Sequence, residues 1–167
     1  NTSLNLIPQG VTESERLGRK CTLKRITVKG RCLLPATTTA AATSDRVKIM
    51  VILDKQCNGA TATVTGVLET AAYNSFRNLA NTGRFRVLKQ YETALNAPAG
   101  GAPTGTPSFG EVVRNFTLDI KCNIPLEFDS TTGALTEIRS NNIFVLAISD
   151  QGVASFLYTT RVRYADN

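Results

Sequence analysis

The chain has 167 residues, of which 42% are hydrophobic, and its 19 Lys and Arg outweigh 13 Asp and Glu to give a formal net charge of +6. This length suits one domain with a sizeable core, and no apolar run approaches the ~20 residues that span a bilayer. The absence of histidine removes the usual general base and the commonest transition-metal ligand. We therefore expect no enzymatic activity, no cofactor, no metal and no membrane contact, while the positive charge favours a polyanionic partner.

The four cysteines, Cys21, Cys32, Cys57 and Cys122, show no CxxC spacing. Without histidine, the common Cys/His zinc patterns are excluded. We interpret all four as buried free thiols, which implies a reducing compartment during folding.

Residues 1–18 are mostly polar and predict an irregular N-terminal arm. A first long strand over 19–34 follows, because cationic and hydroxyl side chains at odd positions 25–31 alternate with apolar ones at even positions. Upstream, Cys21 and Leu23 are odd-numbered, so the phase slips, and we expect a bulge near Lys24–Arg25. One face of this strand is apolar and must be covered by other strands. Its other face is cationic and carries no carboxylate.

Seven further strands are expected downstream, at 47–53, 84–95, 112–122, 124–128, 135–138, 142–148 and 154–164. Those at 47–53 and 142–148 are apolar almost throughout, which predicts central strands covered on both faces. Between them, the apolar spacing over 64–79 is compatible with one or two helical turns. The segments 35–45 and 96–108 are rich in small residues, the second also in Pro and Gly, and are expected to be loops.

Eight strands with short turns and no alternation of strands and helices predict an all-β fold, an antiparallel β-sandwich with Greek-key connections. No internal repeat is present, which argues against a propeller or a solenoid. We expect a single sandwich domain over 19–167 that follows the arm.

Three of the long strands carry cations in their outward phase: Arg25, Lys29, Arg31, Arg84, Arg86, Arg161 and Arg163. If these strands lined one sheet face, the cations would form a plate suited to neutralising phosphates. The alternative is that charged strand faces only maintain solubility and block edge pairing. The coincidence across three strands favours polyanion contact. Because the aromatic residues fall mainly in the apolar phase, we expect contact with backbone phosphates and not with stacked bases.

Four blocks carry a resemblance to a known family: TLKRITVKGRCLL, DRVKIMVILDKQCNGATATVTGVLET, YNSFRNLANTGRFRVLKQYETALN and NNIFVLAISDQGVASFLYTTRVRYAD. In order and pattern they resemble the coat proteins of small icosahedral viruses, such as satellite tobacco necrosis virus and the geminiviruses. Capsid proteins of circular, replication-initiator-encoding single-stranded DNA viruses are the most similar in pattern. The resemblance extends from about residue 10 to the end and rests on strand pattern, not on a signature motif.

This resemblance implies a single jelly roll of two four-stranded sheets, sixty copies of which assemble into a T=1 shell around a single-stranded genome, with DNA favoured over RNA. It places the protein in the virion, assembled inside the host cell and in the nucleus if the genome is DNA. The expected partners are further copies of the chain, the genome and a host receptor that the sequence does not identify. In the family an Arg-rich N-terminal arm binds the genome, but residues 1–18 contain only Arg16. Together with the missing initiator Met, this suggests an upstream arm that is disordered or removed.

In the jelly-roll order the first, third and last long strands share one sheet, which would bring the basic residues onto one surface. The candidate nucleic-acid-binding residues are Arg19, Lys20, Arg25, Lys29, Arg31, Arg84, Arg86, Arg161 and Arg163. A second hypothesis is a jelly-roll binding module, lectin-like or receptor-binding, that acts through the loops 35–45 and 96–108. It predicts ligand affinity insensitive to salt, whereas phosphate contact is salt-sensitive.

Overall fold

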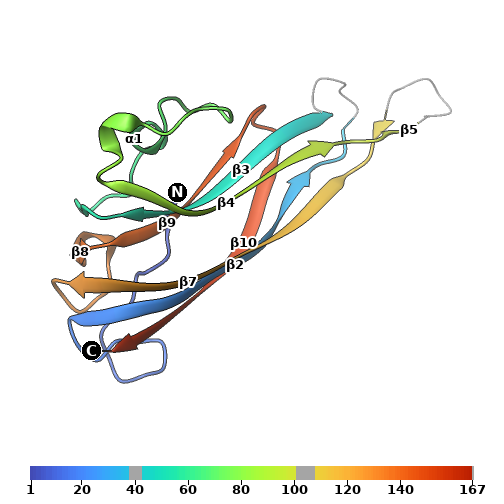
Figure 1. Ribbon diagram of the computed structural model, residues 1–167. Coiled ribbons are helices and arrows are strands. Elements are labelled where there is room, and N and C mark those ends of the chain that lie inside the picture. Colours follow the sequence, from blue (N-terminus) through green and yellow to red (C-terminus); the bar gives the residue numbers. More distant parts are fainter. Residues whose placement is uncertain (38–42, 101–107, 167) are drawn as a thin grey trace.

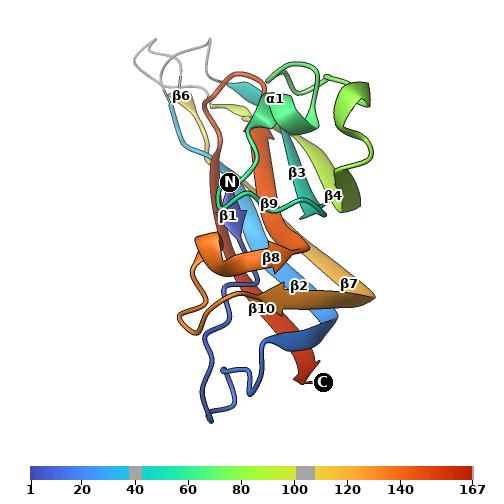
Figure 2. The same cartoon turned by 90° about the vertical axis from the view of Figure 1, so that its left-hand side faces the viewer.

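The computed structural model describes residues 1–37, 43–100 and 108–166, and these form two four-stranded antiparallel sheets packed face to face (Figures 1 and 2). The first sheet has the order β1 (Thr2–Ser3), β9 (Asn142–Ser149), β3 (Ser44–Asp54) and β4 (Phe85–Asn96). The second has the order β10 (Ser155–Asp166), β2 (Lys20–Leu34), β7 (Val112–Phe128) and β8 (Ile138–Ser140). This is the all-β jelly-roll sandwich that the strand pattern and the resemblance predict.

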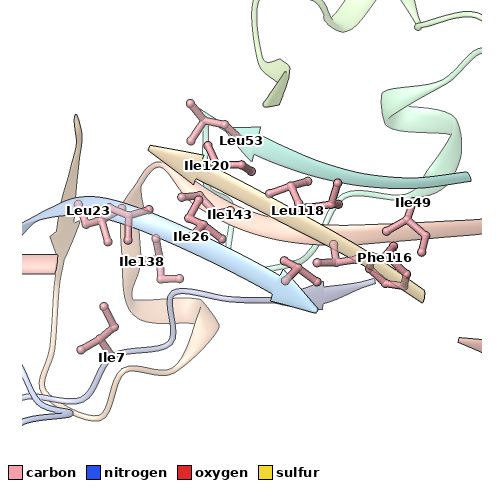
Figure 3. Packing of buried hydrophobic residues seen from close by; sticks show 14 of the residues in the cluster. Ile7, Leu23, Ile26, Ile49, Leu53, Phe116, Leu118, Ile120, Ile138 and Ile143 are labelled. Carbon is pink, nitrogen blue, oxygen red and sulfur yellow. The ribbon is translucent and has the colours of Figure 1, made fainter. Parts of the chain in front are cut away.

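The main core lies between the two sheets and is built from the apolar phase of each long strand (Figure 3). Ile26 of β2 and Leu118 of β7 face Ile49 of β3 and Ile143 of β9, and all four are almost completely buried. Burial of this apolar surface is the main driving force for closing the sandwich.

The predicted bulge is confirmed. The register of β2 shifts against both β10 and β7 between Leu23 and Arg25. Because the shift inverts the phase of the strand, Cys21 and Leu23 point into the same core as Ile26. Downstream, Gly30 replaces a side chain on the inner face, where a Cβ would run into the Leu157 carbonyl and the ring of Phe116.

A second, smaller core covers the outer face of the first sheet. Met50 and Ile52 of β3 and Phe144 of β9 point away from the sandwich and pack under the segment 55–84, which includes Val67 and Leu68. Figure 1 shows this segment, with the short helix α1 (Val64–Val67), lying over β3, β4 and β9. The prediction that β3 and β9 are covered on both faces is therefore correct, and the helical turn expected within 64–79 spans only four residues.

Several boundaries differ from the sequence-based expectation. The strands expected at 112–122 and 124–128 are one strand, β7, which stays paired with β2 through Pro125. The segment 135–138 is mainly a 3₁₀ turn, Leu135–Glu137, followed by β8. Within the loop expected at 96–108, β5 (Ala99–Gly100) pairs with β6 (Ser108–Phe109).

The N-terminal segment packs firmly on the sandwich, because β1 pairs with β9 and Arg16 is completely buried. The Arg16 guanidinium lies 4.2 Å from the centroid of the Phe128 ring and donates hydrogen bonds to the carbonyls of Ile7, Gly18 and Ser130. The Arg16 guanidinium is therefore bound entirely by groups of the fold itself. Across the described ranges, no helix is long and apolar enough to cross a membrane.

All four cysteines are free thiols, as expected, although only Cys21 and Cys32 are fully buried. Burial raises the pKa of both thiols to about 11, so they stay protonated at neutral pH. Cys57 and Cys122 are half-buried.

Candidate nucleic-acid interface

The outer face of the second sheet carries a cluster of cations at its centre. β2 lies between β10 and β7, so the outward side chains of the three strands form rows across the sheet. The registers give these rows as Arg163–Arg25–Lys121, Arg161–Thr27–Asp119, Thr159–Lys29–Thr117 and Leu157–Arg31–Asn115. We call the six cations of these rows the basic face: Arg25, Lys29, Arg31, Lys121, Arg161 and Arg163.

A hollow of about 580 Å³ lies in this face, over the β10–β2–β7 ribbon. Four of the six cations line it, namely Arg25, Lys29, Arg161 and Arg163. Thr27, Thr117 and Thr159 share the outward phase of these cations and also line the hollow, as does Thr160. Guanidinium, ammonium and hydroxyl groups are the donors that proteins use for phosphate oxygens. The hollow therefore has the chemistry of a phosphate site.

One carboxylate interrupts the cationic surface, contrary to the expectation from β2 alone. Asp119 accepts hydrogen bonds from Arg25 Nε and Nη2 at 2.7 and 2.6 Å, and from the Thr27 hydroxyl at 3.1 Å. The Arg25 guanidinium lowers the pKa of Asp119 to about 2, and the same pair raises the pKa of Arg25. Asp119 thus holds Arg25 in a fixed orientation and neutralises it.

The other cations of the hollow have no such partner. Within the described part of the chain, no carboxylate oxygen lies within 4.0 Å of Lys29, Arg161 or Arg163. Arg163 also faces Arg25 directly across the strand pair. Because Asp119 already neutralises Arg25, the positive charge left at this pair of positions is that of Arg163, which an anion could neutralise.

Arg84 and Arg86 do not join this face. The expectation that the first, third and last long strands share one sheet is wrong, because β4 pairs with β3 in the first sheet. Arg84 lies just before β4 and donates from Nε and Nη2 to the buried carboxylate of Asp54, at 2.8 and 2.7 Å. Its role is structural, whereas Arg86 is exposed on the edge strand β4.

Arg19 lies just before β2 and Lys20 is its first residue, at the end of the basic face. Lys20 is opposite Glu127 of β7, with Nζ 3.8 Å from the carboxylate, and Arg19 is exposed beside it. Glu127 also lies 3.6 Å from Arg139 of β8. This end of the sheet has mixed charge, so its cations are less available to an anion.

Two kinds of residue on this face of the second sheet were missing from the sequence-based set. Lys121 and Asp119 follow the outward phase of β7, but that strand could not be placed beside β2 without the tertiary structure. Thr159 of β10 has the same phase as Arg161 and Arg163, and Thr117 of β7 has the same phase as Asp119, and this alternation is the only sequence signal that marks them.

The loops of the alternative hypothesis lie partly outside the described residues, at 38–42 and 101–107. In the parts that are described, Thr37 pairs with Phe109 and β5 pairs with β6. No group of three or more His, Cys, Asp or Glu side chains that could hold a metal ion is found over the described ranges.

A comparison with curated proteins finds no match. The model of the satellite tobacco necrosis virus coat protein family matches residues 1–167, the whole chain. The strand order, the sandwich and the match agree, and the family is one of structural proteins of virus particles. The chain therefore belongs to the satellite tobacco necrosis virus coat protein family and is a viral capsid protein.

Proposed function

We propose that the protein assembles into a T=1 shell of sixty copies and packages a single-stranded genome whose phosphates lie on the basic face. The observation that carries this proposal is the hollow between β10, β2 and β7, where Lys29, Arg161 and Arg163 have no carboxylate partner among the described residues. In this arrangement the second sheet faces the interior of the shell.

The expected recognition is electrostatic and independent of base sequence. Each phosphate neutralised by Lys or Arg releases a counterion, so log K falls with log[salt] by about 0.7 per contact for a single strand. The aromatic rings of the sandwich support this reading, because Tyr91 and Phe116 stack on each other between the sheets with centroids 5.5 Å apart. These two rings are therefore not available to stack on nucleic-acid bases.

The genome chemistry is a separate part of the proposal. The preference for DNA rests on the resemblance to circular single-stranded DNA viruses, and nuclear assembly follows only from that choice. Phosphate contacts are the same for DNA and RNA, and the family match is to the satellite tobacco necrosis virus coat protein. Digestion of the extracted nucleic acid with DNase and with RNase decides between them.

The central experiment compares two charge-matched variants. Arg161→Gln/Arg163→Gln removes two cations of the hollow, and Lys55→Gln/Arg86→Gln removes two exposed cations of the first sheet and its connection. Both purified variants are imaged by negative-stain microscopy, and the 260/280 nm absorbance ratio is read after nuclease treatment. We expect shells from both, with less protected nucleic acid only in the Arg161/Arg163 variant.

Equal nucleic-acid content in the two variants would contradict the assignment of the basic face. Failure of the unmodified protein to form closed shells would contradict assembly itself. Native mass spectrometry of emptied particles counts the copies, and a number other than sixty would refute the T=1 shell.

A further inference from the structure

The segment that covers the first sheet carries two unusually exposed apolar side chains. Phe76 is 79% exposed and Leu79 is 76% exposed, and Arg77 lies between them in the chain. We call these three residues the knob. Large apolar groups at such exposure, grouped at one place, are typical of surfaces that bind a partner.

The knob is held rigidly by the backbone beneath it. Asn78 donates from its backbone N–H to the Val67 carbonyl and from Nδ2 to the Thr65 carbonyl, both at 2.9 Å. Asn81 Nδ2 donates to the Gly66 carbonyl at 2.9 Å. The exposed side chains therefore project from a fixed turn, which reduces the entropy lost when they are buried by a partner.

A second surface, with both polar and exposed apolar side chains, lies in a hollow of about 580 Å³ between residues 11–17 and the end of β10. Val11 is 91% exposed and Leu17 is 64% exposed at its rim, with Val162 and Tyr164 of β10 among the other lining residues. The rim is ordered, because the Leu17 N–H donates to Asp166 at 3.2 Å. We call this hollow the socket.

The charges of the two surfaces are complementary. Glu13, Glu15 and Asp166 line the socket, with Arg163 as its one cation among the residues described there. The knob carries Arg77, with Glu69 close by through its N–H bond to the Phe76 carbonyl. The one cation of the knob and the three carboxylates of the socket are complementary in charge, and both surfaces expose apolar side chains.

The two surfaces cannot meet within one molecule. In both Figure 1 and Figure 2 the segment 55–84 lies at the top, whereas the turn of residues 10–18 lies at the bottom beside the C-terminus. A contact between them must join two copies head to tail, and repetition of a head-to-tail contact closes into a ring when the rotation allows.

We propose that the knob of one subunit inserts into the socket of the next, so that the occupant of the socket is a second copy of this chain. Phe76 and Leu79 then pack against Val11 and Leu17, and Arg77 approaches Glu13. This inference rests on the proposed assembly and names the subunit contact that forms its rings.

The test uses one variant for each side. Phe76→Asp disables the knob and Leu17→Asp disables the socket, while Leu6→Asp alters an apolar residue that is 45% exposed and outside both surfaces. Each substitution is on an exposed side chain, so we expect folded subunits with unchanged melting temperature. The subunit concentration needed for assembly should rise by about tenfold to a hundredfold in the first two variants only.

Mixing separates a head-to-tail contact from a symmetric one. Phe76→Asp retains its socket and Leu17→Asp retains its knob, so a mixture should form 1:1 pairs in analytical ultracentrifugation at concentrations where neither variant associates alone. The charge exchange Arg77→Glu with Glu13→Arg should restore assembly that either change alone weakens.

Normal shells from both Phe76→Asp and Leu17→Asp would overturn the knob–socket contact and leave the capsid assignment intact. Mixtures that associate no better than the separate variants would also overturn it. If the unmodified chain forms no particles, the assembly proposal fails first and this contact fails with it.

Discussion

The outer faces of the two sheets have opposite chemistry. In the first sheet, β3 and β9 point Met50, Ile52 and Phe144 outward, and the segment 55–84 folds back to cover them. In the second sheet, β2 and β10 point Lys29, Arg161 and Arg163 outward, and their hollow stays open. Both sheets pack on the same inner core. The difference between them therefore lies in the side chains of their outer faces, which are apolar in the first sheet and cationic in the second.

This contrast explains why only one sheet is available to an anion. Exposing an apolar outer face to water costs free energy, so a segment of the same chain folds over it and covers it. A cationic face is well solvated and repels itself, so it stays open until a polyanion neutralises it.

The two Arg–Asp pairs follow the same division. Asp54 of the covered sheet is completely buried, and the Arg84 side chain that pairs with it is 24% exposed. Asp119 and Arg25 of the open sheet are 33% and 39% exposed. The first pair is buried within the fold, and the second lies on a surface that is open to solvent.

The largest expected effect is on the covered face. Phe144→Ala should lower the free energy of unfolding by about 3–5 kcal/mol, because it leaves a cavity beside the edge-on ring of Phe85. Thr159→Ala, at an exposed outward position of the other sheet, should change it by less than about 0.5 kcal/mol. Urea denaturation of both variants checks this, and equal losses would show that the outer faces do not differ as described.

Asp54→Ala should have the next largest effect, a loss of about 3 kcal/mol, because it leaves the Arg84 guanidinium without its buried partner. The double variant Asp54→Ala/Arg84→Ala should recover part of this loss in the same denaturation assay. A single variant as stable as the unmodified protein would mean that water replaces the carboxylate.

Acidic pH should destabilise the folded protein by protonating Asp119, which pairs with Arg25 on the second sheet. Since the pKa of Asp119 falls from 3.8 to about 2 in the fold, its ion pair stabilises the folded state fully above pH 3.8 and is lost as the pH falls through about 2. Unfolding measured from pH 5 to pH 2 should show a smaller acid-induced loss in Asp119→Asn than in the unmodified protein. Identical pH profiles would contradict the lowered pKa.

The smallest expected effect is on the salt dependence of binding. Arg161→Gln should make the slope of log K against log[salt] for a single-stranded oligonucleotide shallower by about 0.7, the loss of one phosphate contact. Arg86→Gln, on the other sheet, should leave the slope unchanged. Fluorescence anisotropy at several salt concentrations measures both slopes. A shallower slope for Arg86→Gln would show that Arg86 also contacts the nucleic acid.

Much of the fold follows from residue pattern. The alternation in 25–34 correctly separates the outward Lys29 from the buried Val28, and the phase slip at Leu23 correctly locates the bulge. The prediction broke β7 at Asn123, where the register with β2 shifts opposite the bulge, but the strand stays paired with β2 on both sides of this position.

By itself, the sequence determined the strand pattern, the all-β class and the outward phase of the cations, because these depend only on the period of two along each strand. Tertiary structure alone decided which strands are neighbours. Pairing of β4 with β3 removed Arg84 and Arg86 from the basic face, and pairing of β7 with β2 brought in Lys121 and Asp119. The physical reason is that sheet order is set by long-range burial of apolar faces and not by any local preference of the chain.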